Sequence, residues 1–296
     1  MTEPTRRALH REGGSGAGKS RPEEETGSDT SLLLRWVNSP DGRRELLELP
    51  LTREDYLNPQ VGDKWVQGIP HSSMVVDVAC RLWSWFPRPE FLVVFDVQHL
   101  LGRGLPKPSP DVSVIRGAPK SAWGKGSFDV VKQGVVPCLI VEVLSPMSRR
   151  IREVDENDKV QIYQQAGVPE YLLLDLPRDP AGRLGLIGYR LDSAGIYQRI
   201  VPDEQGRLLC QATGLWFSIS PEGDRLVIRD VATGTLLPSV EEGAEDRRRA
   251  IAEAAREAEA RQAAEEKAAA AEEKAATAET ELARLRAEIE RLRSGG

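Results

Sequence analysis

The sequence predicts an α/β (α+β) fold in which a mixed central sheet is flanked by helices and followed by a long C-terminal helix or coiled coil. Between residues 71 and 175, runs with helical spacing alternate with short apolar runs typical of buried strands. From 241 to 293 the composition changes to Ala, Glu, Arg and Lys, and Gly and Pro are absent from 244 to 293. We therefore expect a disordered N-terminal segment (1–30), one folded domain (31–240) and a helical tail (241–296).

Composition limits the class of protein. The chain has 296 residues and a net charge of −6, which argues against a protein that passively coats nucleic acid through a basic surface. Its three cysteines match no zinc pattern and make a poor disulfide framework. There is neither a signal-peptide stretch nor a run approaching about 18 apolar residues, so we expect a cytoplasmic protein without a membrane span.

Residues 13–20, GGSGAGKS, satisfy the phosphate-loop pattern only as a string of letters. A working loop must follow a buried strand and open a helix whose N-terminal amides bind phosphate. The upstream stretch EPTRRALHRE is not a strand, and the downstream stretch RPEEETGSDT stacks acids where phosphate would lie. We therefore expect a flexible linker here and no nucleotide cofactor.

The elements of the folded domain follow from periodicity. Helical spacing predicts a helix over 71–86, which two prolines then stop. A second helix is predicted over 153–166, with a glycine at the position that suits a C-terminal cap. Strands are expected at 91–97, 112–115, 138–144 and 170–175. Alternating segments broken by Gly, Asp and Pro from about 184 to 230 predict an antiparallel meander.

The tail ends in a heptad seam. Leu282, Leu285, Ile289 and Leu292 follow one another at 3-4-3 spacing, and the earlier seam positions are mostly Ala. This pattern predicts a homo-oligomer, most simply a dimer, formed through the C-terminal helix. A lone solvated helix or a tail that binds another partner stays open as the alternative, because seams rich in Ala are weak.

Four charged residues stand in the apolar centre of the chain. Asp111 opens one predicted strand, and Glu142 lies in the middle of another. Asp155 and Lys159 are one helical turn apart on the helix that follows, so they share a face. A carboxylate in an otherwise apolar strand is usually paired or bound to metal, because an unpaired buried charge is costly.

Two interpretations of Glu142 follow from the residues alone. If the strand of Asp111 lies beside that of Glu142, the two carboxylates converge, and with a backbone carbonyl, such as that of Val143, and water they form a Mg²⁺ site. Such a metal activates water, and Lys159 would donate to the phosphate undergoing attack. In the second interpretation Lys159 simply neutralises Glu142 as a buried ion pair.

Several linked motifs occur in order in this region. They are PDVSV at 110–114, IVEVLSPMS at 140–148, D-x-x-x-K-x-x-x-Y at 155–163 and AGVPEYLLLD at 166–175. In this order they resemble the Uma2 family of restriction-endonuclease-like proteins, part of the PD-(D/E)XK nuclease superfamily. Weaker similarity extends back to the segment 51–59 and forward to about residue 236.

The resemblance implies a restriction-endonuclease-like core and metal-dependent hydrolysis of phosphodiester bonds in DNA, with Mg²⁺ as cofactor and Mn²⁺ as a possible substitute. It implies that Asp111 and Glu142 are catalytic acids that bind the metal. The usual superfamily pattern places a lysine two residues after the second acid, where this chain has Leu144. In Uma2-like proteins a lysine from the following helix takes over that role, and Lys159 fits the position.

Further residues are expected around this catalytic set. Asp155, His71 and Asp96 are supporting candidates, with a surface salt bridge, a helix cap and a turn as the respective structural alternatives. The expected phosphate contacts are Ser145, Arg149, Arg150 and Arg152, which lie close to the proposed site in sequence. The alternative to the whole enzyme hypothesis is a catalytically inactive nuclease-fold module that binds or scaffolds and oligomerises through its tail.

Overall fold

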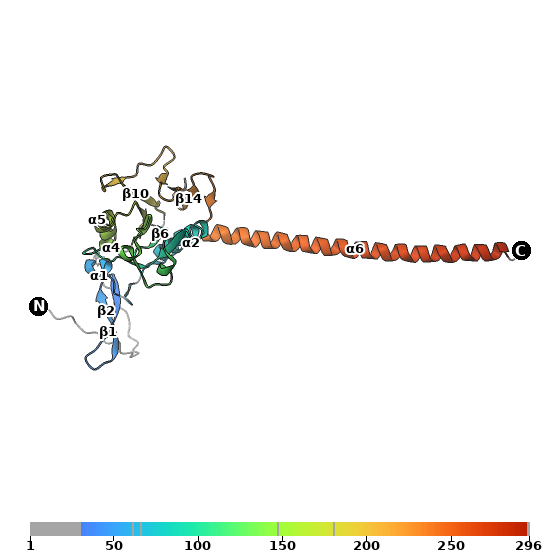
Figure 1. The fold of residues 1–296 in the computed structure, drawn as a ribbon, viewed down its shortest axis with the longest axis horizontal. Coiled ribbons are helices and arrows are strands. Elements are labelled where there is room, and N and C mark those ends of the chain that lie inside the picture. The colour runs from blue at the N-terminus through green and yellow to red at the C-terminus, as the bar shows by residue number, and fades with distance from the viewer. Residues whose placement is uncertain (1–30, 61, 66, 147, 180, 295–296) are drawn as a thin grey trace, which may run out of the picture.

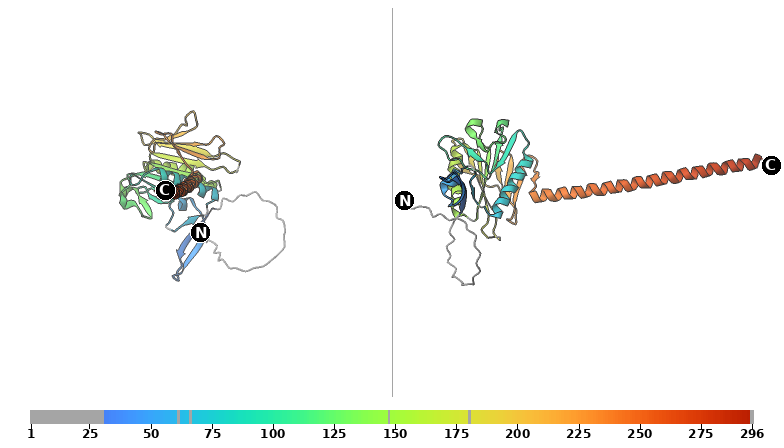
Figure 2. Two further views of the ribbon diagram at one scale, coloured as in Figure 1. Left: turned by 90° about the vertical axis from the view of Figure 1, so that its right-hand side faces the viewer. Right: turned by 90° about the horizontal axis from the view of Figure 1, so that it is seen from below.

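The computed structural model describes residues 31–294 except 61, 66, 147 and 180 (Figure 1). A body of packed sheets and helices carries one long helix that projects away from it (Figures 1 and 2). The segment 1–30, expected to be disordered, and its phosphate-loop string lie outside the described residues. Within the described chain, no helix is both long enough and apolar enough to cross a membrane.

A mixed sheet of six strands forms the centre of the body, in the order β11-β10-β9-β8-β6-β4. Its strands are β4 (Phe91–Phe95), β6 (Val112–Arg116), β8 (Leu139–Leu144), β9 (Glu170–Asp175), β10 (Gly185–Leu191) and β11 (Tyr197–Arg199). β8 and β9 run parallel, and the other neighbours are antiparallel. The predicted mixed sheet is confirmed, and its strand and helix order is that of a restriction-endonuclease-like core.

Alternation along β8 divides its side chains between two cores. Val141 and Val143 belong to a core shared with α2 (Ile69–Trp85) and with a second, four-stranded sheet. Leu144 belongs to a core on the opposite face, which includes α1 (Arg53–Leu57) and the helical segment after β8. Glu142 follows the same alternation as Leu144, so its carboxylate enters the second core.

The helical segment after β8 has three parts. They are α4 (Arg149–Glu153), the π-helical turn η2 (Val154–Asp158) and α5 (Lys159–Gln165). The sequence predicted a single helix from 153, but helical structure begins earlier because the Ser148 side chain accepts a hydrogen bond from the Ile151 amide at the N-cap. A π turn in a helix is rare and often lies at a functional site.

The segments expected to form one meander are all strands, but the structure divides them between two sheets. β10 and β11 extend the central sheet. The second sheet consists of β12 (Leu208–Cys210), β13 (Leu215–Ile219), β14 (Leu226–Asp230) and β15 (Leu236–Leu237). This division lets the second sheet cover one face of the central sheet, where its apolar side chains join the core around α2.

Smaller elements complete the body. An N-terminal hairpin and one further strand form a three-stranded sheet, which the sequence did not predict. These strands are β1 (Leu32–Asn38), β2 (Arg44–Pro50) and β3 (Lys64–Trp65). The remaining elements are β5 (Gln98–Leu100), β7 (Ser127–Asp129), the 3-10 turn η1 (Lys120–Ala122) and α3 (Val130–Gln133).

The long helix α6 (Val240–Ser294) has 55 residues and extends for roughly 80 Å at the usual rise per residue. It is joined to the body near its first turn, where the Val240 amide donates to Asp77 Oδ1 of α2 at 3.0 Å. From 245 to 293 every side chain is exposed. The predicted helical tail is therefore a helix, and it contributes nothing to either core beyond its first turns.

Deleting residues 246–296 is expected to leave the body as stable as before, because the deletion uncovers no buried side chain. The melting temperature, measured by circular dichroism at equal and low protein concentration, should change by less than about 2 °C, or under about 1 kcal/mol. Loss of cooperative unfolding in the shortened chain would contradict this expectation and show that α6 supports the core.

Candidate active site

Asp111 and Glu142 meet where β6 begins beside β8. The Val143 amide donates to Asp111 Oδ2 at 2.7 Å, and the Asp111 amide lies 3.4 Å from Glu142 Oε2. Asp111 is 8 % exposed, whereas Glu142 is fully buried. The two acids therefore form one cluster that reaches from the surface into the second core, and the structure brings them together as the sequence predicted.

The Glu142 carboxylate uses its two oxygens differently. Oε1 receives the Lys159 ammonium at 2.8 Å and a hydrogen bond from the Tyr163 hydroxyl at 2.8 Å. Oε2 lies toward the Asp111 backbone. Burial raises the pKa of Glu142 well above its usual value, Asp111 and Asp155 raise it further, and Lys159 offsets part of this shift.

Lys159 is fully buried and has three polar partners. Its Nζ lies 2.8 Å from Glu142 Oε1, 2.8 Å from Asp155 Oδ1 and 3.1 Å from the hydroxyl oxygen of Tyr56. An ammonium group has three donors, so these partners satisfy it completely. Burial lowers the pKa of Lys159, but the two carboxylates outweigh burial and the net shift is strongly upward, which keeps the lysine charged.

Asp155 connects this lysine to the π turn and to α1. The Tyr56 hydroxyl donates to Asp155 Oδ1 at 3.0 Å, and the Tyr171 hydroxyl donates to the Asp155 backbone carbonyl at 3.0 Å. Burial raises the pKa of Asp155 to about 6 even though Lys159 and Tyr56 favour its charged form. Asp155 is thus part of the buried network rather than of a surface salt bridge on the helix.

His71 lies in the first turns of α2 and faces the same acids. Its Nε2 is 3.3 Å from Asp111 Oδ2, and its side chain is almost fully buried. Burial lowers the pKa of His71, but the Asp111 carboxylate and the Val143 carbonyl outweigh it, so the net shift is upward. The N-cap of α2 is Gly68, which removes helix capping as the role of His71.

Asp96 ends β4 at the edge of the cluster. Its φ of 51° lies in the left-handed region, which Asp adopts more readily than most residues. This conformation stops the strand two residues before its predicted end, and the Asp96 amide donates to the Pro110 carbonyl at 3.1 Å. The side chain is exposed, yet surrounding protein atoms and the charge of Asp111 raise the pKa of Asp96.

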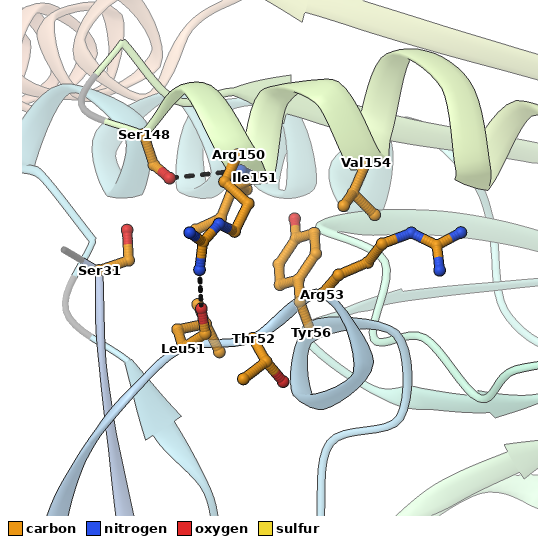
Figure 3. Close-up of a pocket in the computed structure, with 9 residues that line it drawn as sticks. All are labelled: Ser31, Leu51, Thr52, Arg53, Tyr56, Ser148, Arg150, Ile151 and Val154. Atoms are coloured by element: carbon orange, nitrogen blue, oxygen red, sulfur yellow. Dashed lines mark hydrogen bonds between the residues drawn. The ribbon is translucent and has the colours of Figure 1, made fainter. Parts of the chain in front are cut away.

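The expected phosphate contacts have partners elsewhere in the chain. Arg149 pairs with Glu153 at 2.8 Å, and Arg152 pairs with Asp175 at 2.5 Å. Arg150 donates to the Leu51 carbonyl at 3.3 Å across a small pocket (Figure 3). Ser145 is partly buried just after β8. No contact found among the described residues joins these four side chains to the acids, so a phosphate role stays a prediction.

Besides Tyr171, two tyrosines complete the network, and neither was predicted from the sequence to belong to it. Tyr163 follows Lys159 by one helical turn in the motif at 155–163, a spacing that could have indicated a shared partner. Tyr56 comes from α1, where no local pattern marks it. Figure 3 shows the Tyr56 ring standing between α1 and the helical segment after β8.

The donor set fits a hard cation that keeps several waters. Among the described residues, no group of three His, Cys, Asp or Glu side chains is arranged to hold a metal. A structural zinc site normally needs four such ligands, but Mg²⁺ is commonly held by one or two carboxylates, water and substrate phosphate. Asp111 and the Oε2 atom of Glu142 meet that smaller requirement.

Replacing Lys159 with methionine is expected to destabilise the fold by about 3–5 kcal/mol, because Glu142 and Asp155 would keep buried charges without a partner. Urea unfolding monitored by fluorescence measures the change. The matched control is Arg149→Met, which breaks an exposed pair of the same i, i+4 spacing and should cost under about 1 kcal/mol. Similar losses for both variants would contradict a special role for the buried lysine.

The Asp155→Asn variant should differ least from the wild type near neutral pH. Folding raises the pKa of Asp155 from 3.8 to about 6. The contribution of this carboxyl group to the free energy of unfolding is therefore complete below the pKa of the unfolded state, and it is lost as pH rises through the pKa of the folded state. The penalty of Asp155→Asn should therefore shrink between pH 4 and pH 6. Urea unfolding of both chains across this range tests the sign, and a penalty that grows with pH would refute it.

Comparison with known families agrees with this geometry. Residues 44–221 match the model of the Uma2 family, described as "Putative restriction endonuclease". The matched region spans more than half of the chain and contains every residue proposed for the site. No curated protein matches the sequence. The chain belongs to the Uma2 family of restriction-endonuclease-like proteins.

Proposed function

We propose that this protein is a metal-dependent endonuclease that hydrolyses phosphodiester bonds in DNA. The observation that carries the proposal is that the two carboxylate oxygens of Glu142 have different partners. Lys159 and Tyr163 hold Oε1, and Oε2 lies toward Asp111. Membership of the family supports a nuclease-like function. The choice of DNA as substrate, and of Mg²⁺ or Mn²⁺ as cofactor, is part of this proposal.

Asp111, Glu142 and the Val143 carbonyl would hold the metal. The charge balance supports this role, because three carboxyl groups, those of Asp111, Glu142 and Asp155, share the one permanent positive charge of Lys159. Bound there, a divalent cation would supply an activated water and would neutralise charge on the phosphate. Asp111, the more exposed acid, is the one that substrate can approach.

We assign Lys159 the role of a positioning residue. Its three donors are engaged by Glu142, Asp155 and Tyr56, and its side chain has no exposed surface. It therefore orients the Glu142 carboxylate and offsets part of the upward pKa shift that burial causes. The earlier expectation that Lys159 itself donates to phosphate stays a prediction.

His71 is placed to act on Asp111 rather than on substrate. Its Nε2 faces Asp111 Oδ2, and the Val143 amide faces the same oxygen. Both donors would fix the orientation of this carboxylate and leave its other oxygen, Oδ1, for a cation. Asp96, exposed at the rim, would add negative charge where a hydrated cation enters.

The second candidate is a nuclease-fold module that binds or scaffolds without cutting. The observation that favours it is the complete neutralisation of Lys159 within the protein, together with the apolar, fully buried Leu144 at the usual lysine position. Such a module would bind DNA or protein without metal-dependent cleavage. In both cases we propose self-association through α6, and a cytoplasmic location remains a prediction from sequence.

A nicking assay on supercoiled plasmid tests the proposal. The wild type should nick DNA with Mg²⁺ or Mn²⁺, and Glu142→Gln and Asp111→Asn should reduce the rate by about 100-fold or more, the scale typical of removing a group that stabilises developing charge. The control is Glu90→Gln, whose carboxylate pairs with Arg116 at the surface and should leave the rate unchanged.

Metal binding provides a second measurement that does not depend on cleavage. Mn²⁺ should raise the melting temperature of the wild type and of Glu90→Gln, because a ligand that binds only the folded state stabilises it. Asp111→Asn should show no such rise. Equal background nicking by wild type and Asp111→Asn would exclude the enzyme, and DNA binding without nicking would then favour the non-cutting module.

A further inference from the structure

The apolar seam on the exposed helix α6 extends beyond the positions that leucine occupies. Counting back from Leu292 in steps of three and four, every seam position is apolar as far as residue 264. The seam consists of Ala264, Ala268, Ala271, Ala275, Ala278, Leu282, Leu285, Ile289 and Leu292. Its four large side chains are 50–75 % exposed, so the body leaves this face uncovered. An apolar stripe with a period of 3.5 residues is the signature of a helix that pairs with another.

The charges beside the seam identify the partner. In a parallel coiled coil, a residue at heptad position g faces the residue five places further along the other chain, at position e. Taking Leu282 as position a, this rule defines four pairs within residues 267–293. They are Lys267 with Glu272, Lys274 with Glu279, Glu281 with Arg286, and Glu288 with Arg293. All four pairs join opposite charges. The basic residue is at position g in the first two pairs, and the acidic residue is at position g in the last two.

These pairs cannot form within one helix. Residues five places apart point in directions about 140° apart on an α-helix, since each residue turns by about 100°. Within the described part of α6, none of these eight charged side chains forms a salt bridge with another residue of its own chain. The complementarity is therefore available to a second copy of the same segment, whose seam is apolar at the same positions.

Orientation follows from the same charges. In an antiparallel pair, position e faces e and g faces g. The two antiparallel registers that overlap most of the segment bring Glu279 against either Glu279 or Glu272 of the partner chain, which are like charges. The parallel, in-register pair has no like-charge contact among the four, and it stacks the large residues of both chains in the same layers.

We propose that α6 forms a parallel, in-register, two-stranded coiled coil with a second copy of this chain over residues 264–292. Ile289 at position a, followed by Leu292 at position d, favours two strands. The alanine layers allow close approach of two backbones. The pairing places both bodies at the same end of the coiled coil, because α6 joins each body near its first turn. The proposal stands whether or not the protein cleaves DNA.

Cysteine crosslinking tests orientation and register in the full-length chain. Ala271 lies in the seam, so in the parallel pair it faces Ala271 of the partner, whereas in either antiparallel register it faces a position far along the segment. In a Cys80→Ala background, Ala271→Cys should form a disulfide-linked dimer on mild oxidation with copper phenanthroline, which accepts the two electrons of the two thiols. The matched control is Ala269→Cys, on the outer face. Equal crosslinking of both variants would overturn the proposed register.

Charge-reversal variants test whether the partner of α6 is a second copy of the same segment. The double variant E281R/E288R places Arg against Arg, and R286E/R293E places Glu against Glu, so each alone should dimerise at least about 10-fold more weakly than the wild type in sedimentation equilibrium. An equimolar mixture restores all opposite pairs and should recover the wild-type dissociation constant as a heterodimer. Unchanged dimerisation of either variant alone, or no recovery in the mixture, would overturn the proposal. Circular dichroism confirms that α6 stays helical.

Discussion

The buried ammonium group of Lys159 is the interaction on which the site depends. It lies between two carboxylates from different elements, one on β8 and one on the π turn, and a tyrosine from α1 completes its coordination. A charge in this apolar environment is tolerable only when each of its donors is satisfied. The arrangement therefore connects the central strand, the helical segment after it and the N-terminal α1 at one point, and it holds the Glu142 carboxylate through Oε1.

The cluster contains more carboxyl groups than permanently charged basic groups, and this imbalance is the feature that supports the proposed metal site. One lysine faces three carboxyl groups, and burial, together with the neighbouring carboxylates, raises the pKa values of Glu142 and Asp155. The surplus of carboxyl groups is at Asp111, the less deeply buried end of the cluster, which is where the proposed cation would bind.

The sequence predicts the parts of this site that follow from local pattern. Alternation placed Glu142 on the same face as Leu144, and helical spacing put Asp155 and Lys159 on one face, because both rules depend on backbone geometry alone. The same rules could not find Tyr56, which lies 103 residues from Lys159 and meets it only through packing. Neither could they predict the π turn or the left-handed Asp96, whose conformations are selected by tertiary contacts.

Because the lysine stands on the helix and not on the strand, the placement of the Glu142 carboxylate depends on more than β8. A lysine at position 144 would lie on the same strand as Glu142, so its placement would depend on β8 alone. Here Leu144 fills the second core, and the lysine arrives on α5 after the π turn. The Glu142 carboxylate is consequently coupled to the position of that helix and, through Tyr56, to α1. A displacement of α1 or α5 would remove a partner from Lys159 and shift the acid with it, whereas the strands that hold Asp111 could stay in place.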